Sequence, residues 1–172
     1  MGALGPIAHD TAVMAIDFVA ANVERLRAWV QGSPSSYLPG RLFRNSEDLI
    51  VAGQGYNSPK DEASGTVAMA LSVIVLLGGL KKLNAVVGIS GGMDLTGTLS
   101  PVLDVKEKIQ SAKDGGLEMI ILCPAVYDQC AANDFESLPV DLRDYARTAV
   151  HPAKTMVEVM ELTIPGEFRL IA

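Results

Sequence analysis

Ser64 stands where a serine could act as a nucleophile. It follows a turn that begins at Pro59, and it stands just before a long apolar run that predicts a helix. The first N–H groups of a helix lack partners within the helix, and the helix dipole adds partial positive charge there, so this position would stabilise an oxyanion. Serine is also a preferred N-cap residue. Position alone therefore leaves two readings open, a nucleophile or a cap, and a base is needed to separate them.

Lys108 is the candidate base. Val105, Ile109 and Ala112 form the apolar face of a predicted helix, and Lys108 falls on that same face. If its amine is desolvated, the charged form is disfavoured and the neutral amine can accept the proton of a serine hydroxyl. The alternative is a lysine whose stem packs on the apolar face while its ammonium reaches solvent.

Other kinds of site find little support. His9 and His151 carry no surrounding motif, and His151 is expected in a connecting segment, so a Ser-His-Asp triad is not indicated. Cys123 and Cys130 have no second pair at metal-ligand spacing, which predicts free thiols and no metal site. The sequence has no phosphate-binding Gly-x-x-x-x-Gly-Lys-Ser/Thr segment, so we expect no cofactor and no ATPase in this chain.

The elements that would position Ser64 and Lys108 alternate between helices and strands, which predicts a mixed α/β fold. Asp104 is the expected N-cap of the helix that carries Lys108, and Gly91 and Gly92 are expected to reverse the chain between two strands. The predicted helices are Ala8–Val30, Ser64–Leu77, Asp104–Lys113, Ala125–Ala132, Leu142–Ala146 and Ala153–Leu162. The predicted strands are Leu49–Ala52, Ala85–Ile89, Met93–Leu99 and Met119–Cys123, with a loop at Gln31–Gly40.

Composition limits the function classes. The 172 residues are 49% hydrophobic, which suits one domain over residues 1–172 with a filled core. A net charge of −6 without a basic block disfavours nucleic acid as a partner. Val67 to Leu80, the longest nearly uncharged run, is too short to span a membrane. No leader with a small-residue cleavage site opens the sequence, so the expected location is the cytoplasm or an organelle matrix. The chain could be a fragment of a longer protein.

Two segments of the sequence resemble those that carry the catalytic residues of Lon proteases. Pro59-Lys60-Asp61-Glu62-Ala63-Ser64-Gly65 is similar to the family's nucleophile segment, and Leu95 to Lys108 is similar to the segment that delivers its lysine. The resemblance implies a Ser/Lys dyad in which Ser64 is the nucleophile and Lys108, the second lysine of Lys-Glu-Lys, is the general base. The similarity extends from Leu4 to the region of Met156–Val159, and its choice of Lys108 agrees with the helical-face argument.

The resemblance also implies supporting roles and an architecture. Ser90 falls where Lon proteases usually place a threonine that orients the lysine amine, and a serine could make the same hydrogen bond. Asp61, Glu62 and Ala63 fall on the oxyanion-hole loop. The implied fold is a Lon-type proteolytic domain, ribosomal protein S5 domain 2-like, with a mixed sheet and flanking helices. The implied substrates are unfolded or flexible polypeptides, the implied assembly is a homo-oligomer in the form of a hexameric ring, and ATP would enter only through a separate ATPase domain.

The sequence departs from the Lon pattern around the serine and before the lysine helix. Glu62-Ala63 replace the Gly-Pro that usually precedes the serine, Gly65-Thr66 replace the Ala-Gly that usually follows it, and Leu103-Asp104 replace a double glycine before the lysine helix. A carboxylate at Glu62 that pointed inward would oppose a developing oxyanion. Two alternatives to a general endopeptidase therefore stay open. One is a catalytically weak or inactive Lon-like module that binds peptides or serves as a scaffold, and the other is a protease that processes one defined junction.

Overall fold

The computed structural model describes residues 6–29, 63–77, 87–101, 104–123 and 138–164. Its helices are α1 (Pro6–Ala21), α2 (Val23–Trp29), α3 (Thr66–Leu77), α4 (Val105–Asp114), α7 (Val140–Ala149) and α8 (Met156–Thr163), with a 3₁₀ turn, η1 (Ala63–Gly65), directly before α3. Its strands are β1 (Val87–Ser90), β2 (Gly92–Met93), β3 (Leu99–Ser100), β4 (Met119–Leu122) and β5 (Val150–Pro152).

A three-stranded parallel sheet lies at the centre of the described part of the chain. Its strand order is β1-β4-β5, with Val87 opposite Met119 and Ile120 opposite Val150. Helix α4 lies on the connection from β1 to β4, and α7 lies on the connection from β4 to β5, as parallel neighbours require. The mixed α/β architecture expected from the sequence is confirmed.

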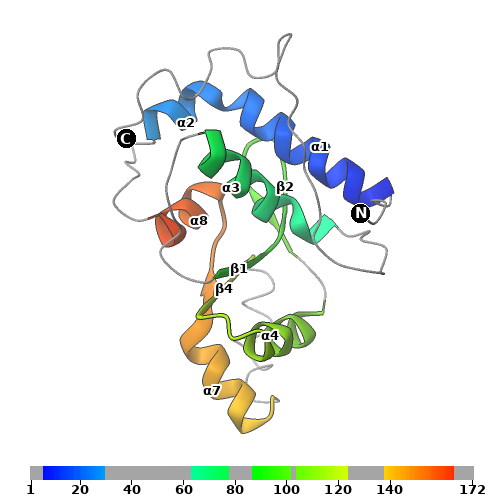
Figure 1. The fold of residues 1–172 in the computed structure, drawn as a ribbon, viewed down its shortest axis with the longest axis vertical. Coiled ribbons are helices and arrows are strands. Elements are labelled where there is room, and N and C mark those ends of the chain that lie inside the picture. The colour runs from blue at the N-terminus through cyan, green and yellow to red at the C-terminus, as the bar shows by residue number, and fades with distance from the viewer. Residues whose placement is uncertain (1–5, 30–62, 78–86, 102–103, 124–137, 165–172) are drawn as a thin grey trace.

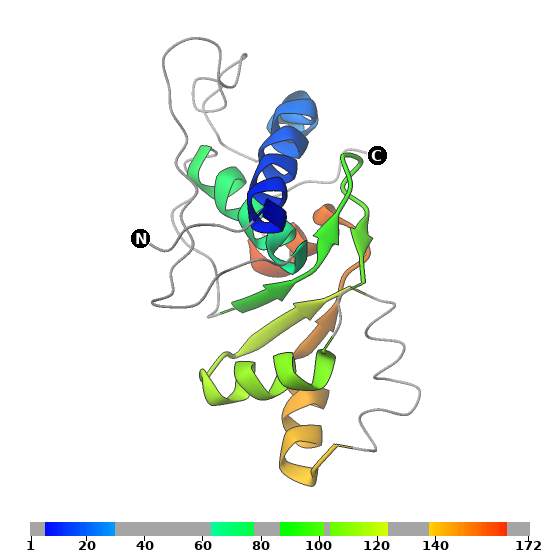
Figure 2. The ribbon, with the colours of Figure 1, turned by 90° about the vertical axis from the view of Figure 1, so that its right-hand side faces the viewer.

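Helices cover both faces of this sheet (Figures 1 and 2). Strand β4 shows the division, because Ile121 packs with α1, α3 and α8, whereas Ile120 and Leu122 pack with α4 and α7. This alternation follows from the two-residue period of a strand, and it explains why β4 reads as a continuous apolar run. In the described residues, no helix is long and apolar enough to cross a membrane.

The first helix is interrupted where the sequence predicts a single helix. Asn22 separates α1 from α2, although the main-chain bonds from Asn22 to Phe18 and from Leu26 to Asn22 continue the helical pattern. The Asn22 side chain donates hydrogen bonds to the carbonyl oxygens of Phe18, at 2.9 Å, and Leu95, at 3.0 Å. Such side-chain bonds compete with regular helical geometry, and the second one ties the helix to a distant turn.

The predicted strand Met93–Leu99 and the predicted reversal at Gly91-Gly92 are both wrong. The chain reverses further on, between the antiparallel strands β2 and β3. The Asp94 carboxylate accepts hydrogen bonds from the backbone N–H groups of Thr96 and Thr98 and from the Thr96 hydroxyl, and Gly97 adopts a positive φ of 87°. The Thr96 hydroxyl, followed by the backbone N–H groups, holds the pKa of Asp94 below its usual value. Asp94 and Gly97 are residues that favour a turn, whereas the apolar residues of the same segment predict a strand.

Three smaller predictions also need correction. Asp104 occupies the N-cap position of α4, but its backbone is left-handed (φ 58°, ψ 46°) and its side chain makes no capping hydrogen bond. His151 lies in strand β5, which is too short at three residues to show a strand period. The following helix starts later than predicted, at Met156, because the Thr155 side chain caps it by accepting from the Glu158 N–H at 3.3 Å.

The remaining element predictions are confirmed where the structure describes them. The helices around Ser64–Leu77, Asp104–Lys113 and Leu142–Ala146 and the strands near Ala85–Ile89 and Met119–Cys123 are present with small shifts of their ends. The predicted loop Gln31–Gly40, strand Leu49–Ala52 and helix Ala125–Ala132 lie outside the described residues.

Candidate active site

Ser64 lies in η1, the 3₁₀ turn directly before α3, and its position is tied to the end of strand β1. The Gly91 N–H donates to the Ser64 carbonyl oxygen at 2.8 Å, and the Val67 N–H donates to the Gly91 carbonyl oxygen at 3.3 Å. Val67 belongs to the first turn of α3, where backbone N–H groups have no partner within the helix. The two bonds therefore hold the segment around Ser64 against the residue that follows Ser90.

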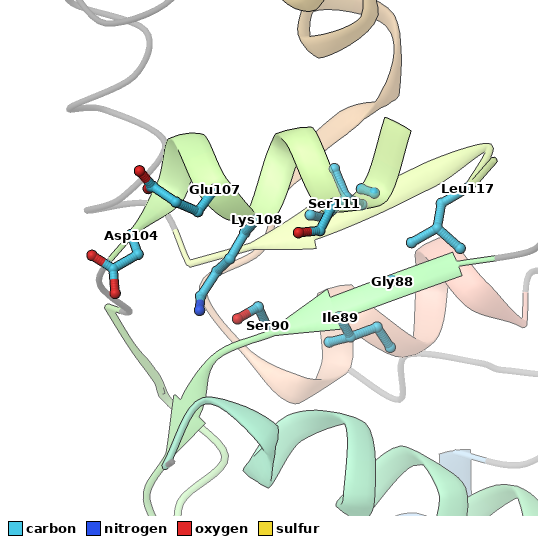
Figure 3. Close-up of a pocket in the computed structure, with 10 residues that line it drawn as sticks. Gly88, Ile89, Ser90, Asp104, Glu107, Lys108, Ser111 and Leu117 are labelled. Atoms are coloured by element: carbon cyan, nitrogen blue, oxygen red, sulfur yellow. The ribbon is translucent and has the colours of Figure 1, made fainter. Parts of the chain in front are cut away.

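Lys108 lies near the start of α4, on the helix face predicted from the sequence. Ile109 and Ala112 on that face are buried, whereas Lys108 is half-buried and Lys106 is exposed. Figure 3 shows the Lys108 side chain directed toward Ser90, at the carboxyl end of β1. The fold thus places a lysine from α4 beside a serine from β1, although 18 positions separate them in the sequence, from residue 90 to residue 108.

Ser90 and Lys108 line a pocket of about 570 Å³ between β1, β4 and α4. Its apolar wall consists of Gly88, Ile89, Ala112, Leu117 and Ile120. Its polar part consists of Ser90, Asp104, Glu107, Lys108 and Ser111. An apolar wall with a few polar groups gathered at one side is typical of a site that binds an organic ligand. Ser64 lies outside this lining.

The other predicted site residues are placed less completely. Ala63 lies in η1 beside Ser64, but Asp61 and Glu62 lie outside the described residues. The structure therefore brings Ser64, Ser90 and Lys108 around the end of β1 and leaves the predicted oxyanion loop as a prediction.

The histidines and the described cysteine lie elsewhere. His9 is exposed on α1, where its Nδ1 lies 3.6 Å from the Asp10 carboxylate, and His151 lies on β5. The buried Cys123 thiol donates to the Leu99 carbonyl oxygen at 3.6 Å. Within the described ranges, no group of three or more histidine, cysteine or acidic side chains could hold a metal ion.

Sequence reasoning missed the part played by Gly91 and by the acidic residues of the pocket. From the sequence, Glu107 is only the middle of Lys-Glu-Lys and Asp104 only a cap, yet both line the pocket beside Lys108. The useful signal is periodic, because Glu107 and Lys108 follow Asp104 by three and four residues and precede Ser111 by four and three, the spacing of neighbours on one side of a helix.

Comparison with known protein families gives a decisive match. The model of the Lon protease (S16) C-terminal proteolytic domain matches residues 1–166 of the 172. The chain belongs to this Lon family. Membership supports a peptidase and agrees with the mixed α/β fold, with its parallel sheet and flanking helices.

Individual Lon proteases are similar to this chain in sequence. The Lon protease of Flavobacterium johnsoniae is 31% identical over 122 residues, and that of Porphyromonas gingivalis is 30% identical over the same length, in each case 71% of this chain. The Lon protease of Escherichia coli (strain K12) is 26% identical over 166 residues, or 96% of this chain. The chain spans only 14%, 13% and 19% of the lengths of these three relatives.

Proposed function

We propose that the chain is a serine endopeptidase domain in which Ser64 is the nucleophile and Lys108 the general base. The neutral Lys108 amine takes the proton of the Ser64 hydroxyl while Oγ attacks the carbonyl carbon of a peptide bond. The ammonium then returns the proton to the leaving amine as the C–N bond breaks. A water molecule, deprotonated by Lys108, hydrolyses the acyl-enzyme and restores the Ser64 hydroxyl.

One observation carries this proposal beyond family membership. The dipeptide Ser90-Gly91 at the end of β1 meets both halves of the dyad, because Gly91 bonds to the Ser64 carbonyl at 2.8 Å and the Lys108 side chain is directed toward Ser90. Ser90 is suited to accept a hydrogen bond from the ammonium or donate one to the neutral amine, and so to orient Lys108 in both states.

We further propose that backbone N–H groups between Asp61 and Ser64 stabilise the oxyanion, and that Asp61 influences the conformation of this loop. The start of α3 supports this arrangement, because a helix N-terminus favours negative charge. The N–H of Val67 already donates to Gly91, so the donors to the oxyanion would precede α3.

The wider setting is proposed from the Lon family. The substrates would be unfolded or flexible polypeptides, and the domain would take the ribosomal protein S5 domain 2-like fold and assemble as a homo-oligomeric ring of six. ATP-driven unfolding would come from a separate ATPase domain, and the location would be the cytoplasm or an organelle matrix.

Hydrolysis of casein tests the dyad directly. We expect the wild type to cut at neutral and mildly alkaline pH, and Ser64→Ala and Lys108→Ala each to lose at least about 10³-fold in rate. Lys106→Ala is the matched control, since Lys106 is an exposed lysine of the same helix and its loss leaves the dyad intact.

The outcomes separate the alternatives. Cleavage by Ser64→Ala equal to wild type would remove Ser64 from the mechanism. Cleavage of casein at a single position would favour a protease for one defined junction. If wild type and variants all fail to cut, a peptide-binding or scaffold module becomes the leading account.

A further inference from the structure

Gly91 connects strand β1 to the nucleophile segment through both of its backbone polar groups. Its N–H donates to the Ser64 carbonyl oxygen and its own carbonyl oxygen accepts from the Val67 N–H. Ser64 and Val67 are three residues apart, so the two bonds span the single turn that carries the proposed nucleophile. Because Gly91 is the donor in one bond and the acceptor in the other, a shift of Gly91 relative to α3 would disturb both.

The requirement for glycine at this position is one of space. Gly91 is buried, and its backbone is not in the positive-φ region, where Gly97 and Gly116 lie among the described glycines. A Cβ at Gly91 would lie 3.3 Å from Val67 Cγ2 and 3.7 Å from Leu99 Cδ2. Val67 is fully buried, so its side chain has little room to retreat. A side chain at position 91 would therefore push the first turn of α3 away from β1.

The residue before Gly91 meets the other half of the proposed dyad. Ser90 lines the pocket with Lys108, whose side chain is directed toward it (Figure 3). The position of Lys108 is set by α4. The position of Ser64 is set by η1, by the bond from Gly91 to the Ser64 carbonyl and by the bond from Val67 of α3 to Gly91. Two adjacent residues at the end of β1 thus meet both members of the proposed dyad. Ser90 lies beside Lys108 of α4, and Gly91 is bonded to Ser64 of η1.

We propose that Gly91 is a positioning residue of the dyad, which sets the approach of Ser64 to Lys108 through the paired bonds to Ser64 and Val67. This inference rests on the proposed peptidase function. It assigns to Gly91 a role in the reaction rate that differs from a contribution to stability, since its bonds reach Ser64 and Val67, neither of which lines the pocket.

The test compares Gly91→Ala, Val67→Ala and the double variant by the rate at which a fluorophosphonate probe labels Ser64. We expect Gly91→Ala to label about 3- to 10-fold more slowly, because the new methyl group would displace its neighbour by only a fraction of the roughly 1 Å misplacement that can cost about 100-fold. Val67→Ala removes the atom that the new methyl group would meet, so the double variant should regain most of the labelling rate that Gly91→Ala loses. For a flexible peptide substrate, kcat should follow labelling while KM changes little.

Val73→Ala is the control for stability. Val73 is a buried valine of α3 that packs in the same core cluster as Val67 but takes no part in the bonds to Gly91. It should lower the unfolding midpoint, yet label within about twofold of wild type. Amide hydrogen exchange at Val67 should be faster in Gly91→Ala than in Val73→Ala, which ties the loss of rate to the loss of the bond.

Each remaining result has one meaning. If wild type is labelled at Ser64 and Gly91→Ala is labelled equally fast, the positioning role is overturned while the proposed function stands. The same holds if Val73→Ala slows labelling as much as Gly91→Ala, or if the double variant shows no recovery. If wild type is not labelled at all, the proposed function fails and the role of Gly91 fails with it.

Discussion

At the scale of single residues, Ser90 is the side chain toward which Lys108 is directed, and its hydroxyl can be altered in two informative ways. Alanine removes the hydroxyl, whereas threonine keeps it and adds a methyl group. Ser90 is half-buried at the end of β1 and lines the pocket, so a change there acts close to the proposed base.

We expect Ser90→Ala to lower kcat by about fivefold, because one hydrogen bond contributes about 1 kcal/mol and its loss frees the amine to adopt other orientations. Ser90→Thr should keep most of the wild-type kcat. Ser72→Ala is the control, since Ser72 is exposed on α3 and its hydroxyl donates to the Ala68 carbonyl of its own helix, at 2.8 Å. Measurement of kcat with a peptide substrate tests this prediction. Equal values for Ser90→Ala and wild type would exclude Ser90 from the mechanism.

At the scale of elements, the start of α4 holds an unusual residue. Asp104 has a left-handed backbone, a conformation that glycine adopts freely and that costs most other residues about 1–2 kcal/mol. The resemblance to Lon proteases places the second of two glycines at this position. The conformation of the turn is thus the one that a glycine would favour, while the side chain here adds a carboxylate to the pocket.

This conformation predicts that a glycine variant at position 104 is more stable than an alanine variant, the reverse of the order inside a helix. Asp104→Gly should be more stable than Asp104→Ala by about 0.5–1 kcal/mol, because alanine is disfavoured in the left-handed region. At Ser111, an exposed position inside α4, the order should be the usual one, with alanine more stable than glycine by about 1 kcal/mol. Urea unfolding of the four variants measures both differences, and the same order at the two positions would contradict the backbone assignment.

At the scale of the whole molecule, the central sheet joins two sets of helices that have separate cores. Strand β4 contributes Ile121 to the core with α1, α3 and α8, and Ile120 and Leu122 to the core with α4 and α7. Ser64 belongs to the first set of helices and Lys108 to the second, so the sheet is the structure that holds the proposed dyad together.

Loss of packing at the centre should therefore affect the molecule as a unit. Ile121 is 0% exposed, and Ile121→Ala should lower the free energy of unfolding by about 2–5 kcal/mol. Val140→Ala should change it by less than about 0.5 kcal/mol, because Val140 is 68% exposed at the start of α7. Denaturant unfolding gives both values, and a small effect at Ile121 would mean that the core can close around the missing atoms.

The sequence by itself determined the elements with strong local signals. Apolar periodicity located the helices of Ser64–Leu77 and Asp104–Lys113, and it was sufficient to place Lys108 on the buried side of its helix. The short motifs around Ser64 and Lys108 led to the Lon family, which the match over residues 1–166 confirms. These properties depend on residues that are close together in the chain, so a local pattern can show them.

Only the tertiary structure decided which distant residues meet. The bonds of Gly91 to Ser64 and Val67, the hydrogen bond from Asn22 to Leu95 and the parallel pairing of β5 with β4 all join segments far apart in sequence. The left-handed backbone of Asp104 and the turn at Asp94–Gly97 likewise went against the local prediction. Such features follow from packing and hydrogen bonding across the whole domain, which outweigh local preferences of about 1 kcal/mol or less per residue.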